Sequence, residues 1–446
     1  MSLDTVETAP PRPRRPVRTE IADERLLAGL DPGHLAARFG TPLYVYDLDV
    51  VERHLAALQA DVPPRVDIAY AVKANPALAV VAHLGALGTG ADVASGGELA
   101  TALRAGIPAG RIVMTGPGKR DEELRAAVEA GVRAVTVESR GELGRLEAIA
   151  KDAGRVQPVL LRMAVGGRGR LERVRLVGDD GAGKFGMDFA DLAESAADAV
   201  ASGHLDFLGV HAFGASNVLD AEALLEHVAA TVRVARRLAM RVGTPLRLID
   251  AGGGLGIPYE ADEGTLDLGA LGRGLAAITA SWAQDPILAD ARLLLEPGRF
   301  LVGPAGAYLA RVVDRKTVGG SGVVILDGGV HHVLRPALVR QEHRIHAFGS
   351  GTGPTVPVTV AGPLCSGLDV FGHGVPMTPP EVGDLVAILD VGAYGFTESM
   401  PFFLSHPIPA EVAVRAGQAV LIRPRQEPGE WLDRQLLPAW EWSADR

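Results

Sequence analysis

The sequence predicts an α/β chain in which a (β/α)8 barrel is followed by an all-β domain. Eight short apolar runs alternate with longer stretches rich in Ala, Leu, Glu and Arg. Continuous apolar strands between helices are typical of a parallel sheet covered on its outer face, and eight such units match a TIM barrel. An open doubly wound sheet shares this periodicity and stays the alternative. The runs are 66–72 (VDIAYAV), 90–95 (GADVAS), 111–116 (RIVMTG), 132–137 (VRAVTV), 156–163 (VQPVLLRM), 207–213 (FLGVHAF), 246–252 (LRLIDAG) and 292–298 (RLLLEPG).

A change in the residue pattern after Arg299 predicts the second domain. The apolar runs there are separated by Gly, Pro and Asp turns without a convincing helical period, which is typical of an all-β domain. The strand-like segment 41–48 precedes the barrel and could pair into that domain. We therefore expect a disordered leader at 1–24, an N-terminal contribution to the β domain at 25–50, the barrel at 51–300, the β domain at 301–425 and a tail at 426–446.

Length, charge and cysteine content limit the function classes. The 446 residues exceed the ~250–300 at which single cores stop growing, so two domains are expected. The net charge of -10 disfavours a nucleic-acid binder, and no apolar run reaches the ~18–20 residues of a membrane span. A single cysteine, Cys365, excludes an intrachain disulfide and fits a reducing compartment. The proline- and arginine-rich start lacks the apolar core of a secretory signal, so we expect a cytoplasmic protein.

Two loops of the predicted barrel have the composition of phosphate-binding loops. Barrel enzymes commonly hold phosphate after the seventh and eighth strands, at the end where catalytic residues gather. The seventh strand here ends in Gly252, Gly253 and Gly254, which let backbone N–H groups approach an anion. The eighth ends in 296–299 (EPGR), which adds a fixed cation. Glycine triplets occur in many turns, but both loops together favour a phosphate site.

Lys73 ends the first predicted strand, within AYAVKANP. Burying an ammonium without a partner is costly. Such a lysine either extends to solvent along its aliphatic chain or works in the barrel mouth, where desolvation supports imine chemistry. With the phosphate loops and Glu296, it describes a pyridoxal phosphate (PLP) site in which Lys73 holds the cofactor as a Schiff base. Glu296 could pair with the pyridine nitrogen and make the ring a better electron sink.

Seven motifs extend this interpretation. They are 70–76 (YAVKANP), 90–99 (GADVASGGEL), 184–186 (KFG), 250–256 (DAGGGLG), 296–306 (EPGRFLVGPAG), 362–371 (GPLCSGLDVF) and 392–396 (GAYGF). In this order they resemble the fold-type III PLP-dependent decarboxylases, which include the diaminopimelate, ornithine and arginine decarboxylases. The resemblance implies an alanine-racemase-like barrel, a C-terminal β domain, and a head-to-tail homodimer with two shared active sites.

The resemblance also implies roles for the matching residues. Lys73 would be the Schiff-base lysine, with Asp92 near it, and Glu296 would face the pyridinium. A lone cysteine is usually a small buried hydrophobe, but Cys365, within GPLC, would be donated by the neighbouring subunit and would supply a proton after carbon dioxide leaves. The phosphate would be held by Ser216, Gly254, Gly298, Arg299 and Tyr394.

Departures from the family pattern bear on the substrate. Diaminopimelate and ornithine decarboxylases carry an acidic residue directly after the cysteine, where this chain has Ser366; Val339 replaces the tyrosine that ends RPALY in the diaminopimelate enzymes. Leaving a distal ammonium buried without its carboxylate would cost roughly 3–5 kcal/mol, so a diamino acid is a poor candidate. Arg335 is retained, so an anionic or carbonyl-bearing distal group stays open.

Two further departures lie near the cofactor and in the tail. Phe213 stands where the family usually stacks a histidine on the cofactor ring; it can stack but cannot donate a hydrogen bond, and a tolerated aromatic exchange is the simpler interpretation. After GAYGF the tail is remodelled, and Phe402, Phe403 and His406 would help line the substrate entrance. His406 could equally be an ordinary loop histidine.

These losses point to specialised members of the family in siderophore or antibiotic biosynthesis, which decarboxylate a conjugated or carrier-protein-bound amino acid. An acidic carrier would need a basic surface, such as the arginines of 166–176, although basic loops are usually just solvated. The alternatives are a diaminopimelate decarboxylase of lysine biosynthesis, an amino-acid racemase, and a non-catalytic PLP-binding protein, which the extra domain disfavours. We expect neither a metal nor a nucleic-acid or membrane partner.

Overall fold

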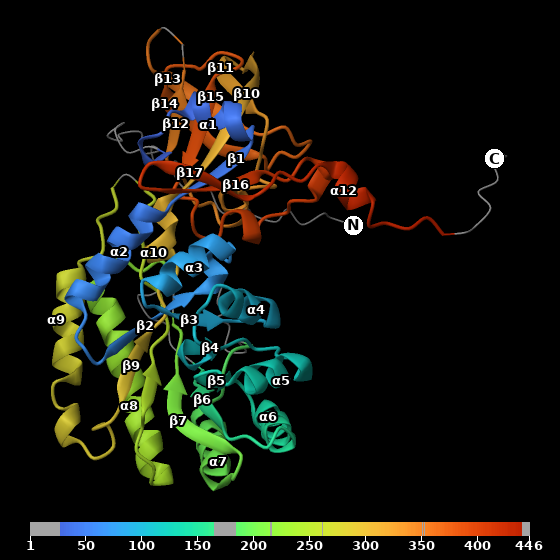
Figure 1. Cartoon of the computed structure of the whole chain (residues 1–446). Helices are drawn as coiled ribbons and strands as arrows, with labels where there is room; N and C mark the ends of the chain where they lie inside the picture. The colour runs from blue at the N-terminus through green and yellow to red at the C-terminus, as the bar shows by residue number, and fades with distance from the viewer. Residues whose placement is uncertain are drawn as a thin grey trace, which may run out of the picture.

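The computed structural model describes residues 27–164 and 184–438, apart from residues 215, 261, 350 and 352. Two units follow one another along the molecule, a helix-ringed barrel and a β-rich domain (Figure 1). The predicted barrel and β domain are thereby confirmed. The doubly wound alternative is wrong, because the eight parallel strands close on themselves. The arginines of 166–176 lie outside the described residues.

The barrel closes because its first strand, β2, pairs in parallel with both β3 and β9. Its interior is filled by a cluster of apolar side chains from seven of the strands, which include Ala69, Val113, Leu160 and Leu294. Such packing makes the barrel a solid core and leaves the strand ends as the place for chemistry. The strands are β2 (Val66–Ala71), β3 (Gly90–Val93), β4 (Ile112–Met114), β5 (Ala134–Val137), β6 (Gln157–Arg162), β7 (Leu205–His211), β8 (Leu248–Asp250) and β9 (Arg292–Leu295).

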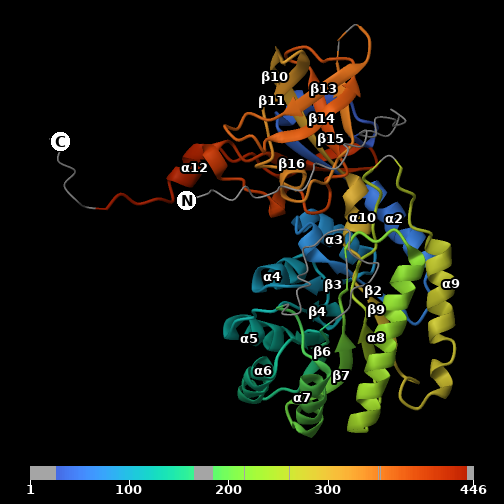
Figure 2. The same ribbon diagram turned by 180° about the vertical axis from the view of Figure 1, so that it is seen from behind.

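Helices cover the outside of the barrel, as the view from behind also shows (Figure 2). Their starts are encoded locally: Ser95, Ser139 and Asp188 each accept a hydrogen bond from a backbone N–H in the first turn, which satisfies a donor that the helix leaves free. The helices are α2 (Leu48–Asp61), α3 (Leu78–Ala86), α4 (Gly96–Arg104), α5 (Asp121–Ala130), α6 (Arg140–Asp152), α7 (Phe189–Ala201), α8 (Ala221–Val242), α9 (Leu268–Thr279) and the short α10 (Arg299–Val302).

The β domain is built on a nine-stranded sheet with the path β14-β13-β11-β10-β1-β16-β17; β15 also pairs with β10, and β12 pairs with β15. The N-terminal strand β1 pairs with β10 antiparallel and with β16 in parallel, so chain from before the barrel lies inside this sheet. The strands are β1 (Leu43–Asp47), β10 (Gly306–Val318), β11 (Ser321–Leu326), β12 (Ile345–Phe348), β13 (Val356–Ala361), β14 (Val370–Met377), β15 (Leu385–Leu389), β16 (Ala410–Arg415) and β17 (Gln418–Arg423).

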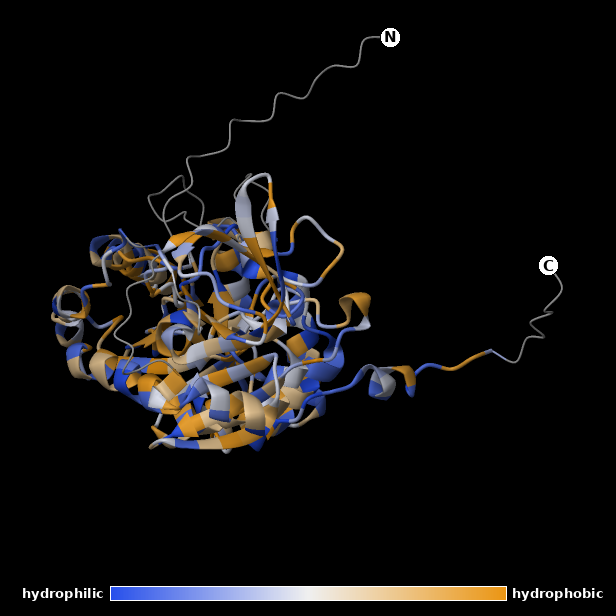
Figure 3. Cartoon of the chain, turned by 90° about the horizontal axis from the view of Figure 1, so that it is seen from above, coloured by the Kyte–Doolittle hydropathy of each residue, from blue (hydrophilic) through white to orange (hydrophobic). Residues whose placement is uncertain are grey.

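Three short helices accompany the sheet: α1 (Pro32–Phe39), α11 (Arg335–Leu338) and α12 (Pro428–Leu432). Helix α12 projects beside the β domain and leads into an extended segment (Figure 1). Figure 3 shows an apolar stretch in that segment. The side chains of Leu436 and Leu437 are 92% and 89% exposed. None of the helices within the described ranges is long and apolar enough to cross a membrane.

Candidate active site

Five polar side chains come together where the barrel strands end. Lys73 lies in a single 3-10 turn directly after β2. Asp92 lies in β3, His211 ends β7, Asp250 ends β8 and Glu296 follows β9. Because parallel strands of a barrel end at the same rim, these side chains share one mouth.

Lys73 is held by a carboxylate that is itself fixed. Its Nζ donates to Asp92 Oδ2 at 2.9 Å, and Asp92 Oδ1 accepts from the Thr115 hydroxyl at 2.7 Å. Asp92 is buried, whereas 37% of the Lys73 side chain is exposed. The Lys73 Nζ also lies 5.5 Å from the centre of the Phe213 ring. Burial alone would lower the pKa of Lys73, but the Asp92 and Glu296 carboxylates outweigh it and raise that pKa. The ammonium is thus positioned in the mouth, next to an aromatic face.

Glu296, His211 and Asp250 form a buried acidic cluster beside Lys73. His211 Nε2 lies 3.4 Å from Glu296 Oε2, and Asp250 Oδ1 accepts from the Gly252 N–H at 2.9 Å. Burial opposes ionisation of Glu296, yet His211 and Lys73 lower its pKa to about 2. Burial and the neighbouring Glu296 raise the pKa of Asp250 well above its usual range. One carboxylate therefore stays charged while the other keeps its proton.

The same cluster has an unused hydrogen-bond acceptor. Glu296 Oε1 is buried without a hydrogen-bonding partner among the described groups, and a carboxylate can accept several hydrogen bonds. Ligand atoms of His211, Asp250 and Glu296 lie within 4.8 Å of one another, so a cation could also bind there. Glu296 Oε1 is therefore suited to accept a ring N–H.

Arg299 supplies the fixed positive charge of the mouth. It is 3% exposed. Its Nη1 donates to the Tyr259 hydroxyl at 2.8 Å and its Nη2 to Ser216 Oγ at 3.5 Å. Its Nε has no partner among the described groups. A buried guanidinium with an unused donor is suited to an anion.

Two glycines of the 252–254 loop are required by their surroundings. A Cβ on Gly253 would lie 2.3 Å from the Glu296 carbonyl oxygen. Gly254 has a φ of 99°, which side chains rarely adopt. The loop therefore presents bare backbone next to Glu296, as an anion-binding loop needs.

Tyr394 connects this mouth with the β domain. Its N–H donates to the Ala74 carbonyl at 2.7 Å, one residue after Lys73. Its ring packs between two guanidiniums, with the Arg299 Cζ 4.8 Å and the Arg335 Cζ 4.7 Å from the ring centre. Arg335 is 2% exposed and forms an ion pair with Glu398, whose Oε2 lies 2.9 Å from the Arg335 Nε.

Comparisons with known proteins agree with this arrangement. Residues 48–303 match the family model of the pyridoxal-dependent decarboxylases, pyridoxal-binding domain. The chain belongs to this family. Among its relatives, the L-glutamyl-[BtrI acyl-carrier protein] decarboxylase of Niallia circulans is 33% identical over 90% of this chain and 95% of its own. A diaminopimelate decarboxylase of Methanothermobacter thermautotrophicus is 34% identical over 93% and 96%. The crystal structure of diaminopimelate decarboxylase from Helicobacter pylori complexed with L-lysine has a TM-score of 0.83 at 29% identity, covering 90% of this chain and 98% of its own.

This pyridoxal-dependent decarboxylase thus uses PLP to remove the carboxyl group of an amino-acid substrate. The mouth fits that cofactor. Lys73 is a primary amine beside an aromatic ring, Glu296 is an ionised buried acceptor, and Arg299 with the bare 252–254 loop suits a phosphate. These groups occupy one mouth, although they come from strands far apart in the sequence.

Three residues assigned to the substrate or to proton transfer lie elsewhere, in the β domain. Cys365 is exposed in the loop between β13 and β14. Ser366, in the same loop, accepts the Leu368 N–H on its hydroxyl at 3.2 Å. Val339 follows α11, and its N–H donates to the Arg335 carbonyl at 3.1 Å. Of the distal-pocket candidates, the structure of the single chain brings Arg335 to the mouth.

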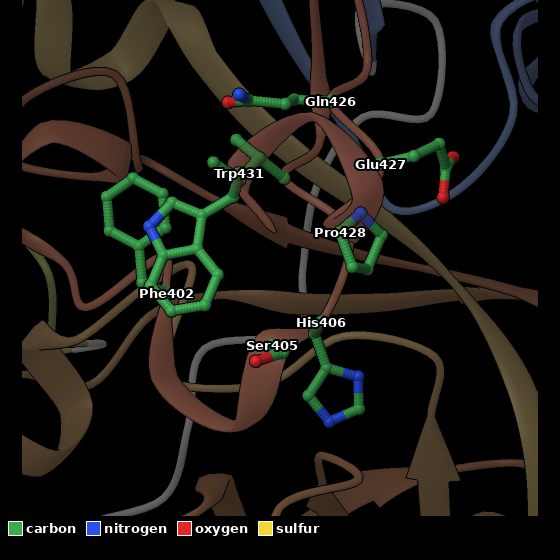
Figure 4. Close-up of a pocket in the computed structure, with 8 residues that line it drawn as sticks. Phe402, Ser405, His406, Gln426, Glu427, Pro428 and Trp431 are labelled. Atoms are coloured by element: carbon green, nitrogen blue, oxygen red, sulfur yellow. The ribbon is translucent and has the colours of Figure 1, made fainter. Parts of the chain in front are cut away.

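The remodelled tail forms a small pocket, lined by Phe402, Ser405, His406, Ile408, Gln426, Glu427, Pro428 and Trp431 (Figure 4). The Phe402 and Trp431 rings stack at 5.7 Å, so Trp431 packs on the tail; Trp440 and Trp442 lie outside the described residues. His406 lies 4.9 Å from the buried His331 ring. Phe403 is exposed. These contacts give the tail a packing role of its own.

Four residues of the mouth escaped the sequence analysis. His211 and Asp250 are polar residues at the ends of apolar strands, and the reasoning that singled out Lys73 would have found both. Tyr259 and Glu398 lie in loops, and their contacts with Arg299 and Arg335 join positions 40 and 63 residues apart. No local pattern marks such contacts.

Proposed function

We propose that this decarboxylase acts on an amino acid whose distal end is joined to a carrier protein or a similar conjugating group. Ser366 carries the proposal. A diamino acid needs a carboxylate for its distal ammonium, and the Ser366 hydroxyl instead accepts a backbone N–H within its own loop. The relative from Niallia circulans, named for an L-glutamyl carrier-protein substrate, supports a conjugated glutamyl group.

In this proposal residues of the barrel mouth would bind the cofactor. Lys73 carries it covalently, and Asp92 holds the Lys73 amine in place. Glu296, whose pKa His211 helps to lower, would accept the pyridine N–H. Ser216, Gly253, Gly254, Gly298, Arg299 and Tyr394 would hold the phosphate, and Phe213 would stack on the ring.

The reaction breaks the bond between Cα and the carboxyl carbon, releases carbon dioxide and replaces it with a proton on Cα. Bound PLP supplies an electron sink for the pair that the departing carboxylate leaves behind. Cys365 of the partner subunit delivers the proton from its thiol. We therefore propose a head-to-tail homodimer, since Cys365 is exposed on the β domain of the single chain.

The test is a carbon-dioxide-release assay with purified holoenzyme. The substrates are the γ-glutamyl thioester of N-acetylcysteamine, free L-glutamate, diaminopimelate and L-ornithine. We expect kcat/KM for the thioester to exceed that for each free amino acid by about tenfold or more. Rapid turnover of diaminopimelate or L-ornithine would contradict the proposal.

Diaminopimelate decarboxylation is the second candidate, and several diaminopimelate decarboxylases at 31–34% identity favour it. The same assay separates it from the first. Epimerisation without carbon dioxide release would instead favour racemase chemistry. We further propose a cytoplasmic location. We also propose a role in secondary metabolism, which a gene position beside genes for a carrier protein and a conjugating enzyme would support.

A further inference from the structure

The Arg335–Glu398 ion pair has no role in the chemistry described so far. Arg335 begins α11, and Glu398 lies in a short 3-10 turn at the start of the remodelled tail. The Arg335 Nη2 donates to Glu398 Oε1 at 3.2 Å, and its Nη1 donates to Gln341 Oε1 at 3.3 Å. The guanidinium is nearly fully buried, while 26% of the Glu398 side chain is exposed. Glu398 therefore stands between Arg335 and solvent.

The pair is part of the active-site wall. The Arg335 guanidinium packs on the Tyr394 ring, whose backbone is hydrogen-bonded to Ala74. Ala74 is the residue after Lys73, so Tyr394 links the ion pair to the turn that carries Lys73. Ser399, next to Glu398, holds the Leu334 N–H at 3.0 Å and so fixes the turn that carries Glu398 against α11. The Tyr394 ring thus contacts Arg335, and the Ser399 hydroxyl holds the turn that carries Glu398.

The charges of Arg335 and Glu398 determine which distal group of a substrate can bind beside them. A free arginine at the distal end of the pocket would bind the carboxylate of a free acidic amino acid through charge-assisted hydrogen bonds. Glu398 already neutralises this guanidinium, and a second carboxylate brought against it would meet a like charge at close range. An ester, thioester or amide carbonyl is uncharged. It can accept a remaining guanidinium N–H without displacing Glu398.

We propose that Glu398 is a specificity-determining residue: by pairing with Arg335 it excludes a free distal carboxylate and admits a distal acyl group in ester, thioester or amide linkage. This deepens the function proposed above and rests on it for the identity of the substrate. It assigns the selection against free glutamate to one carboxylate of the tail. Ser366 and Val339, which stand in place of the family's acidic residue and tyrosine, act against diamino acids, and that is a separate discrimination.

The test compares Glu398→Gln with the wild-type holoenzyme. Gln keeps the size and an acceptor for Arg335 but removes the negative charge, so the guanidinium becomes available to an anion. KM for carbon dioxide release from free L-glutamate should fall by about tenfold, with a small change in kcat. KM for the γ-glutamyl thioester of N-acetylcysteamine should stay within about threefold of wild type. In Glu398→Gln/Arg335→Met the gain for free glutamate should disappear.

The matched control is Glu381→Gln, which removes one carboxylate from an exposed ion pair with Arg315 in the same domain. It should leave both KM values unchanged. Visible absorbance and the melting temperature check that each variant binds cofactor and folds. If Glu398→Gln fails to fold, Glu398→Ala and Glu398→Met test the same charge removal.

A binding measurement separates this inference from the proposed function. Glutarate is a dicarboxylate without an α-amino group, so the enzyme cannot decarboxylate it. Calorimetry should show that glutarate binds Glu398→Gln about tenfold more tightly than it binds the wild type. Unchanged glutarate binding together with an unchanged KM for glutamate overturns the role of Glu398, even when the thioester is the preferred substrate. Tighter glutarate binding in an enzyme that rejects the thioester overturns the proposed substrate and keeps the charge role.

Discussion

The barrel mouth and the distal wall of the same active site are constructed differently. In the mouth, Lys73, Asp92 and Glu296 each lie in or directly after a buried strand, and hydrogen bonds fix them from behind. The distal wall belongs to loops of the β domain: Glu398 lies in the tail beside Arg335, and in the proposed homodimer the Cys365 loop, with Ser366 of the partner subunit, would complete it. Strand ends are held by the whole barrel, whereas loops change with little effect on the core. In the proposed function, the strand ends of the barrel position the groups for the reaction, and the loops of the β domain select the substrate.

The largest expected effect is at Lys73. In Lys73→Ala, kcat should fall by on the order of 10³-fold or more, because the covalent attachment of the cofactor is lost. The visible absorbance band of the lysine-bound cofactor should vanish. Lys151→Ala, on the exposed face of α6, is the control and should keep both. Persistence of the band in Lys73→Ala would refute the attachment site.

A smaller loss is expected at Glu296. Glu296→Gln should lower kcat by about 10²-fold, because the buried negative charge that faces the cofactor ring is removed. Since the pKa of Glu296 is lowered to about 2, the wild-type enzyme should show no titration of this group in kcat between pH 5 and 9. His211→Phe removes the neighbour that lowers this pKa and should shift the cofactor absorbance with less loss of rate. An unchanged spectrum in both variants would contradict the role of this cluster.

Substitutions in the distal wall should change which substrate is preferred and have little effect on kcat. Ser366→Glu/Val339→Tyr restores a carboxylate and a hydroxyl at the distal end. We expect KM for diaminopimelate to fall by about tenfold with little change for the γ-glutamyl thioester. Ser366→Gln/Val339→Tyr, which adds no charge, is the control. Equal gains in both double variants would show that size, and not charge, sets the preference.

Sequence patterns captured the mouth far better than the wall. Lys73 and Glu296 could be found because a charged residue that ends an apolar strand is unusual, and because strand order places all strand ends together. Glu398 could not be found, since its pairing with Arg335 depends on how two loops of the β domain fold back on each other. Tyr259 is similar: its hydroxyl accepts from Arg299 only because the loop after β8 returns to the mouth. Loop contacts of this kind follow from tertiary packing and leave no periodic signal.

Away from the site, acid stability should depend on His331. The ring is fully buried, both nitrogens lack partners among the described groups, and the His332 ring lies 3.7 Å away. Burial, and then the charge of His406, lower the pKa of His331 from 6.5 to about 4. The unfolded chain therefore binds a proton at a pH where the folded chain does not, and stability falls as pH decreases from 6.5 to 4.

His331→Phe should reduce that acid sensitivity. The melting temperature of the wild-type holoenzyme should drop more between pH 7.5 and pH 5 than that of the variant. His34→Phe, at an exposed position in α1, should behave like wild type. Parallel curves for wild type and His331→Phe would show that His331 does not titrate on unfolding.

The smallest effect is expected in the tail. Phe402→Ala removes a ring stacked on Trp431, and since Phe402 is 52% exposed the loss should be about 1 kcal/mol or less. Calorimetric unfolding measures it. The kinetic constants for the γ-glutamyl thioester should change by less than about threefold. A large rise in KM would instead place Phe402 at the substrate entrance.

The most direct test is a competition in one reaction. Equal concentrations of the γ-glutamyl thioester of N-acetylcysteamine and of diaminopimelate, each labelled with a different carbon isotope in the departing carboxyl group, are offered to the holoenzyme. The ratio of labelled carbon dioxide gives the ratio of kcat/KM without separate assays. We predict that the thioester is favoured by about tenfold or more. A ratio that favours diaminopimelate would contradict the claim that this active site keeps the family's reaction and has changed its substrate.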